Sequence, residues 1–142
     1  MIREATIEDK SQINNLGNLF IENFHNKFNL DSYICNDNYT ILVNDENNVN
    51  AFLIVYKNID YYEIEMIYVD NKVRNNGIAT QLLTAFFENL LTNSVILLEV
   101  AVDNYNAIKL YKRFNFEVIN IRKKYYNGID AYVMKKVIWW KT

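Results

Sequence analysis

The fold is decided by the stretch from Ile64 to Leu83, which runs IEMIYVDNKVRNNGIATQLL. It begins as an apolar segment typical of a buried strand, passes through a polar loop with one glycine, and ends in an amphipathic helical pattern. Glycine is scarce, since the chain has three, at positions 17, 77 and 128, and it has no proline. A helix start presents free backbone N–H groups and partial positive charge. The stretch is therefore typical of an anion site, most often for phosphate.

The composition narrows the class of protein. A length of 142 residues with 51% hydrophobic content fits one domain, residues 1–142. The net charge of −2 argues against a nucleic-acid partner, because such domains are usually basic. One cysteine, Cys35, and one histidine, His25, argue against a disulfide framework and a metal site. Neither a signal-peptide pattern nor an apolar run of membrane-spanning length is found, so we expect a soluble cytoplasmic protein without a membrane partner.

The apolar periodicities predict strands and helices in alternation. We expect strands at residues 2–5, 39–43, 51–56, 61–69, 95–102, 116–121 and 131–138. We expect helices from a Thr6–Asp9 capping pattern to about Asn23, as a weak turn over 30–35, from Gly77 through Leu91, and from about 104 to 114. This order predicts an α/β (α+β) fold, with helices on both faces of one sheet.

Three motifs resemble those of the GNAT (GCN5-related) N-acetyltransferase superfamily. The first is Arg74-x-x-Gly77-x-Ala79. The second, LEVAVDNYNAIKLY from Leu98 to Tyr111, and the third, RKKYYNGIDAYVM from Arg122 to Met134, are similar to the RimI-like ribosomal-protein alanine N-acetyltransferase branch. The resemblance implies the GNAT fold over nearly the whole chain, with a single mixed, mostly antiparallel sheet of about six to seven strands flanked by about four helices.

The sequence departs from the branch pattern in three places. Ala101 stands where the branch usually has arginine, and Asn115 stands where it has glycine. Asparagine accepts a left-handed backbone, so we expect the second change to be nearly silent. The segment from Asn26 to Ser32 lacks the branch's Pro-Trp-Ser sequence, which lies near the acceptor groove. These departures concern the acceptor rather than the reaction.

The resemblance implies that acetyl-CoA is the acyl donor, and that no metal takes part. The pyrophosphate would be bound by the loop and the helix start, at Arg74, Asn75, Asn76, Gly77, Ile78, Ala79 and Thr80. Backbone groups of Ile67, Tyr68 and Val69 would bind pantetheine and the acetyl carbonyl as an added strand does. Two roles are open for Asn104, which is either a helix N-cap or a CoA contact. The alternative for the loop as a whole is an ordinary glycine turn.

Two residues are the catalytic candidates that the resemblance implies. Glu99, inside an apolar strand, would act as general base, directly or through water, with a pKa raised by desolvation. The alternative is a structural glutamate paired with a lysine or arginine. Tyr111 would act as general acid toward the CoA thiolate, and the alternative is a core tyrosine of a helix.

The acceptor is a primary amine in both enzymatic hypotheses. The first is a protein N-terminal α-amine, as in the RimI-like branch, and the second is a small amine such as a polyamine, amino acid or aminoglycoside. A third hypothesis, from another class, is a non-catalytic acyl-CoA-binding module. Tyr125 and Tyr126 are candidates for the acceptor groove, and Trp139 with Trp140 for a subunit contact, so the chain is expected to be a monomer or a homodimer.

Overall fold

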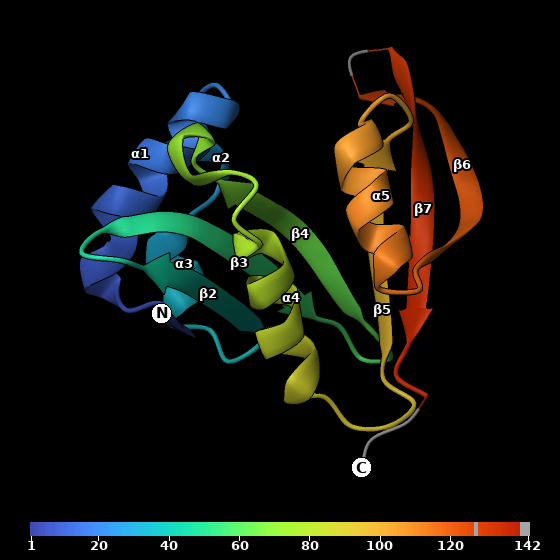
Figure 1. Ribbon diagram of the computed structural model, residues 1–142, viewed down its shortest axis with the longest axis horizontal. Helices are drawn as coiled ribbons and strands as arrows, with labels where there is room; N and C mark the ends of the chain where they lie inside the picture. The colour runs from blue at the N-terminus through green and yellow to red at the C-terminus, as the bar shows by residue number, and fades with distance from the viewer. Residues whose placement is uncertain (127, 140–142) are drawn as a thin grey trace. The chain divides into compact units, whose positions relative to one another are not determined.

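A computed structural model describes residues 1–126 and 128–139 of the chain (Figure 1). Seven strands pair in the order β1-β2-β3-β4-β5-β7-β6. Their bounds are β1 Ile2–Glu4, β2 Tyr39–Asp45, β3 Val49–Lys57, β4 Tyr62–Val69, β5 Val95–Ala101, β6 Glu117–Tyr126 and β7 Ile129–Val137. Strands β4 and β5 are parallel, whereas β1–β2, β2–β3, β5–β7 and β6–β7 are antiparallel. The predicted mixed, mostly antiparallel sheet is confirmed.

Five α-helices are described, one more than the four expected. They are α1 Lys10–Phe20, α2 Phe24–Lys27, α3 Leu30–Ile34, α4 Ile78–Glu88 and α5 Tyr105–Arg113. Two 3-10 turns, Ile7–Asp9 and Asn71–Val73, precede α1 and α4. None of the helices in the described ranges is long and apolar enough to span a membrane.

The chain divides into two compact units. Unit 1 comprises Met1–Lys57 and Met66–Asn89, and unit 2 comprises Asn58–Glu65 and Leu90–Thr142. Strand β4 contributes its first half to unit 2 and its second half to unit 1. These units are divisions by internal contacts, and the expectation that residues 1–142 form one domain stays a prediction.

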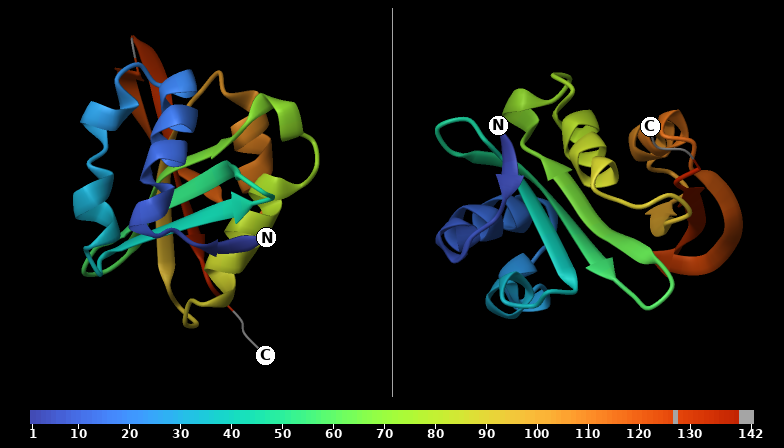
Figure 2. Two further views of the ribbon diagram at one scale, coloured as in Figure 1. Left: turned by 90° about the vertical axis from the view of Figure 1, so that its left-hand side faces the viewer. Right: turned by 90° about the horizontal axis from the view of Figure 1, so that it is seen from below.

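In unit 1, helices cover both faces of the sheet. Figure 2 shows α1 and α3 on one face of β2 and β3, and α4 on the other. The first face is built around buried residues such as Ile13, Phe24 and Phe52. Alternate strand residues such as Leu53 point to the other face, where α4 buries Leu82 and Leu83.

The first helix is shorter than predicted. It ends at Phe20 rather than at about Asn23, because Ile21 is extended and Asn23 adopts a left-handed conformation with φ 58°. This reversal brings the fully buried Phe24 ring back onto Gly17 of α1. The end of α4 also differs, since the helix stops at Glu88 and Leu91, expected on its apolar face, is 81% exposed.

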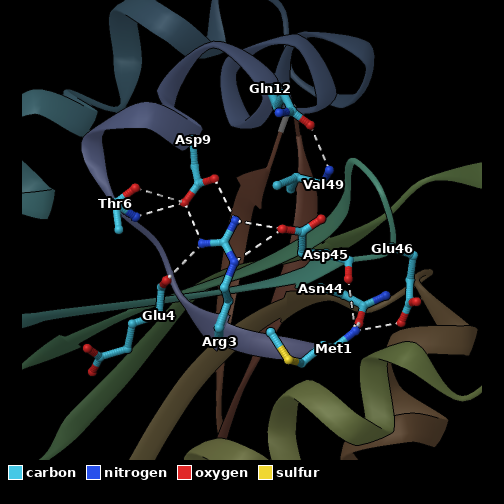
Figure 3. Close-up of polar contacts among 10 residues, drawn as sticks. All are labelled: Met1, Arg3, Glu4, Thr6, Asp9, Gln12, Asn44, Asp45, Glu46 and Val49. Carbon is cyan, nitrogen blue, oxygen red and sulfur yellow. Dashed lines mark hydrogen bonds and ion pairs between the residues drawn. The ribbon is translucent and has the colours of Figure 1, made fainter.

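A polar network ties β1 to the start of α1 in unit 1 (Figure 3). The Arg3 guanidinium donates to both carboxylate oxygens of Asp9, each at 2.8 Å, and to Asp45 at 2.9 Å. Asp9 also accepts from the backbone N–H of Thr6 at 2.8 Å, which confirms the predicted capping pattern. The bonds from Arg3 hold the pKa of the buried Asp9 carboxyl below its usual range.

In unit 2, the first half of β4 pairs with β5, and the sheet continues from β5 through β7 to β6. Figure 1 shows α5 lying along β5 and β7. Residues Ile96, Leu98 and Val100 of β5 are buried, whereas the residues between them are partly exposed. Because side chains alternate along a strand, Glu99 lies on the opposite face of β5 from Leu98.

Candidate functional site

The strand, loop and helix of the central stretch form one candidate site in unit 1. The loop begins at Asp70, whose Oδ1 accepts from the Lys72 backbone N–H at 3.2 Å. Asn75 and Gly77 then adopt left-handed conformations, with φ 67° and φ 75°. A left-handed residue is inexpensive when it is glycine or asparagine, so the two residue types suit the path of the loop.

The N-terminus of α4 is suited to bind an anion. Gly77 precedes the helix, and a glycine has no side chain with which to cap the first N–H groups, those of Ile78, Ala79 and Thr80. A Cβ placed on Gly77 would have no atom within 4 Å, so the space beside it is open. Open N–H groups at a helix start suit an anion such as a phosphate.

The Arg74 side chain turns back onto the strand that leads into the loop. Its Nε donates to the Val69 carbonyl at 2.9 Å, and its guanidinium carbon lies 5.4 Å from the centre of the Tyr68 ring. Asn76 donates through Nδ2 to the Val73 carbonyl at 2.9 Å. These two side chains bind the loop's own backbone, which stabilises the loop conformation.

The three β4 residues expected to contact pantetheine differ in burial. Tyr68 is buried and its ring lies 5.1 Å from that of Phe20, whereas Ile67 and Val69 are partly exposed. The register between β4 and β5 covers Tyr62 to Ile64. Ile67 to Val69 lie beyond the last pair of that register.

Glu99 lies in unit 2 as one member of a charged cluster. Its Oε1 is 3.0 Å from Nε of Arg122 on β6, and its side chain is 18% exposed. The structure thus shows the arginine partner of the structural alternative. The ion pair orients the carboxylate, and because a carboxylate has two oxygens, it leaves acceptor capacity for a proton.

A cavity of about 380 Å³ in unit 2 contains this ion pair. Its lining comprises Tyr61, Glu63, Leu97, Leu98, Glu99, Asn120, Arg122 and Val133. Burial and the negative charge of Glu99 raise the pKa of Glu63, and the positive charge of Arg122 opposes that rise. Sequence analysis missed Glu63, although one signal was present in the sequence, a carboxylate inside a predicted strand; the structure adds that it lies in register with Leu97 of β5.

Helix α5 positions the other two candidates in unit 2. Oδ1 of Asn104 accepts from the Ala107 backbone N–H at 3.3 Å, which is the N-cap role considered for it. Tyr111 is buried, with its ring edge-on to Phe116 at 5.6 Å between centroids. Asn115, just after the helix, has φ 68°, so it adopts the left-handed conformation expected there.

Some sequence-based candidates have no described side chain. The side chains of Tyr125 and Tyr126 and the whole of Trp140 lie outside the described part of the chain. Trp139 is described and is 77% exposed. Within residues 1–126 and 128–139, no group of three or more His, Cys, Asp or Glu side chains is placed to hold a metal ion.

Comparison with known proteins gives sequence relatives at modest identity. One is the N-alpha-acetyltransferase RimI of Mycobacterium tuberculosis, 35% identical over 77 residues, which are 53% of this chain and 48% of that protein. Another is the L-amino acid N-acetyltransferase AaaT of Escherichia coli, 42% identical over 78 residues, which are 50% of this chain and 48% of that protein. The chain therefore spans about half the length of each of these curated relatives.

Two solved structures share the fold along all or nearly all of the chain. The ribosomal-protein-S18-alanine N-acetyltransferase of Escherichia coli matches with a TM-score of 0.84 at 23% identity, covering 100% of this chain and 96% of that one. Arabidopsis thaliana NAA60 in complex with acetyl-CoA matches with a TM-score of 0.80 at 17% identity, covering 97% and 98%. The family model of the GNAT acetyltransferases matches residues 9–116. This chain belongs to the GNAT acetyltransferase family.

Proposed function

We propose that the chain is an acetyl-CoA-dependent N-acetyltransferase that acts on a primary amine by direct transfer. The observation that carries the proposal is the left-handed Gly77 at the uncapped start of α4, in a chain of the GNAT family. Its acceptor, in this proposal, is the α-amine of a protein N-terminus. The similarity to the M. tuberculosis RimI enzyme and to the E. coli S18-alanine acetyltransferase fold supports this choice.

The donor site in this proposal uses the unit 1 loop. Backbone N–H groups from Asn75 to Thr80 bind the pyrophosphate, and the α4 dipole adds to the stabilisation. Backbone groups of Ile67, Tyr68 and Val69 bind pantetheine as a neighbouring strand would. Arg74 supports the loop through the bond from its Nε to the Val69 carbonyl, and in the proposal its guanidinium charge also stabilises the pyrophosphate.

The chemistry requires one proton to leave the amine and one to reach the sulfur. The neutral amine attacks the thioester carbonyl, a C–N bond forms and the C–S bond breaks. In the proposal, Glu99 takes the amine proton and Tyr111 donates its phenol proton to the CoA thiolate. The Arg122 ion pair fixes the position of the Glu99 carboxylate while its second oxygen accepts the proton.

The test is CoA release with a panel of amines. The protein is incubated with acetyl-CoA and a peptide carrying the N-terminus of ribosomal protein S18, and free thiol is measured. We expect release with the peptide, and a large loss of kcat in Glu99→Gln and Tyr111→Phe with the Kd for acetyl-CoA retained. Thiol release with other amines but not with the peptide would contradict the acceptor assignment.

A small-amine acceptor is the second candidate. The similarity to the L-amino acid acetyltransferase AaaT favours it, as does Ala101 in place of the arginine of the RimI-like pattern. The same panel therefore includes free amino acids and spermidine. If kcat/KM for a free amino acid or for spermidine exceeds kcat/KM for the peptide, the acceptor is a small amine.

The binding-module hypothesis is separated by comparing binding with turnover. If acetyl-CoA binds and no amine in the panel releases thiol, the chain retains the donor site without the reaction. In that case Glu99→Gln should bind acetyl-CoA as tightly as the parent protein, and neither protein should release thiol.

A further inference from the structure

The proposed mechanism leaves one carboxylate of the unit 2 cavity unused. Glu63 lies on β4, is partly buried, and lines the cavity together with Glu99 and Arg122. Arg122 is engaged with Glu99 at 3.0 Å. Within residues 1–126 and 128–139, the Glu63 side chain forms no hydrogen bond or ion pair, although its backbone is paired in the β4–β5 ladder.

The charges of the cavity favour a cation. Two carboxylates and one guanidinium line it, so the lining carries one net negative charge; Arg122 is ion-paired with Glu99 and acts on Glu63 through its charge alone. A partly desolvated carboxylate without a partner is costly, and an arriving positive charge removes that cost. Burial and then the negative charge of Glu99 raise the pKa of Glu63, and the charge of Arg122 only partly opposes that rise.

The rest of the lining suits an organic cation rather than a metal ion. Leu97 and Val133 provide apolar surface for carbon atoms next to a charged nitrogen, and Tyr61 and Asn120 add polar groups. A hard metal ion prefers several oxygen ligands, whereas an ammonium needs one carboxylate and a few hydrogen-bond acceptors. A primary ammonium on an alkyl or peptide chain therefore matches the cavity.

We propose that Glu63 is the residue that binds the positively charged amine of the acceptor, and that it selects acceptors whose amine has no anionic group beside it. This inference rests on the proposed function, because the bound amine is an acceptor only if the protein transfers acetyl groups. The shared chemistry is a primary ammonium, which a protein N-terminus and a polyamine both supply. A free amino acid is disfavoured, because its carboxylate would enter the same negatively charged cavity.

The first experiment measures binding without turnover. The carboxyl carbon of Glu63 is followed by NMR through a pH titration, alone and with each of three probes: an unblocked peptide amide, the same peptide N-acetylated, and spermidine. The unblocked peptide or spermidine should lower the pKa of Glu63, because a bound ammonium stabilises the carboxylate. The N-acetylated peptide should leave it unchanged, and whichever amine binds more tightly identifies the source of the ammonium.

Variants then test the role of the carboxylate. Glu63→Gln should weaken binding of the amine probe by about tenfold or more, since it removes a charge-assisted contact. Glu63→Asp should retain most of the binding, and Glu117→Gln, an exposed glutamate of β6, should bind as the parent does. Thermal melting of each variant checks that it is folded.

Three results separate this inference from the proposed function. Equal binding by the parent and folded Glu63→Gln, or equal binding of free and N-acetylated peptide, overturns the inference even if the parent transfers acetyl groups. Amine binding that depends on Glu63, in a protein that transfers no acetyl group, overturns the proposed function and supports the cation site. Loss of binding in Glu63→Gln but not in Glu117→Gln, together with transfer by the parent, supports both.

Discussion

Substituting Gly17 by alanine should destabilise unit 1, although alanine is the better helix former. A Cβ on Gly17 would lie 2.3 Å from two atoms of the Phe24 ring, Cδ1 and Cγ, and 2.6 Å from a third. Favourable carbon–carbon contacts begin at about 3.5 Å, so helix and ring must separate by more than about 1 Å. The ring cannot move freely, because it is fully buried, stacked on Phe28 at 4.7 Å and packed against Phe52 at 5.6 Å.

The net effect is a difference between two opposing contributions. Overpacking of a core costs about 1–3 kcal/mol, and the enclosed ring places this site at the upper end. Replacing glycine by alanine inside a helix gains about 1 kcal/mol. We therefore expect Gly17→Ala to lower the free energy of unfolding by about 2 kcal/mol.

Urea unfolding followed by circular dichroism measures this difference. With a slope of about 2 kcal/mol/M, the midpoint should fall by about 1 M. Asn15→Ala, at an exposed position of α1, is the control for helix propensity and should not fall. In a double-mutant cycle, Phe24→Leu should relieve the clash, so that Gly17→Ala costs less in that background. A Gly17→Ala protein as stable as the parent would refute the packing argument.

Three further predictions follow from the same structure. Gly77→Ala should raise the Kd for acetyl-CoA in a binding titration, because a φ of 75° costs a non-glycine residue about 1 kcal/mol and disfavours this conformation of the loop. The protein should stay folded, because the added Cβ would meet no atom within 4 Å. Asp9 has a lowered pKa in the folded state, so the ionised carboxylate stabilises the fold at any pH above its unfolded pKa of about 4, and this stabilisation is lost as the pH falls below that value. The urea midpoint of the parent should therefore drop in acid, and that of Asp9→Asn should drop less steeply. Asn104→Ala should lower the melting temperature through loss of the cap on the Ala107 N–H, at a cost of about 1 kcal/mol.

The sequence predicted the elements whose signals are local. The strand, loop and helix around Gly77 were anticipated from one glycine and two periodicities, and the structure places a left-handed residue there. Asn104 was anticipated as a cap for the same reason, since a cap depends on residues within one turn. The end of α1 was missed because it depends on the packing of Phe24 against Gly17, a tertiary contact that no local pattern carries.

The charged cluster of unit 2 was only half predicted. Glu99 was found through its motif, but its partner Arg122 is distant in sequence and meets it through strand pairing. Glu63 belongs to no motif and enters the cavity because β4 pairs in parallel with β5. Side chains that meet across strands are fixed by register, and register is not visible in a single sequence.

The division of β4 between the two units has a consequence for synthesis of the chain. All of unit 1 has been synthesised once Asn89 is added. At that point unit 2 consists of Asn58–Glu65 alone, because the rest of it begins at Leu90. Until β5 has been made, the Tyr62 to Ile64 segment exposes the strand edge that β5 later pairs with. An unpaired edge is a template for wrong pairing with other chains. The nascent protein is therefore vulnerable to wrong pairing at this edge until β5 is complete at Ala101, and cutting the chain at any one point cannot yield both units intact.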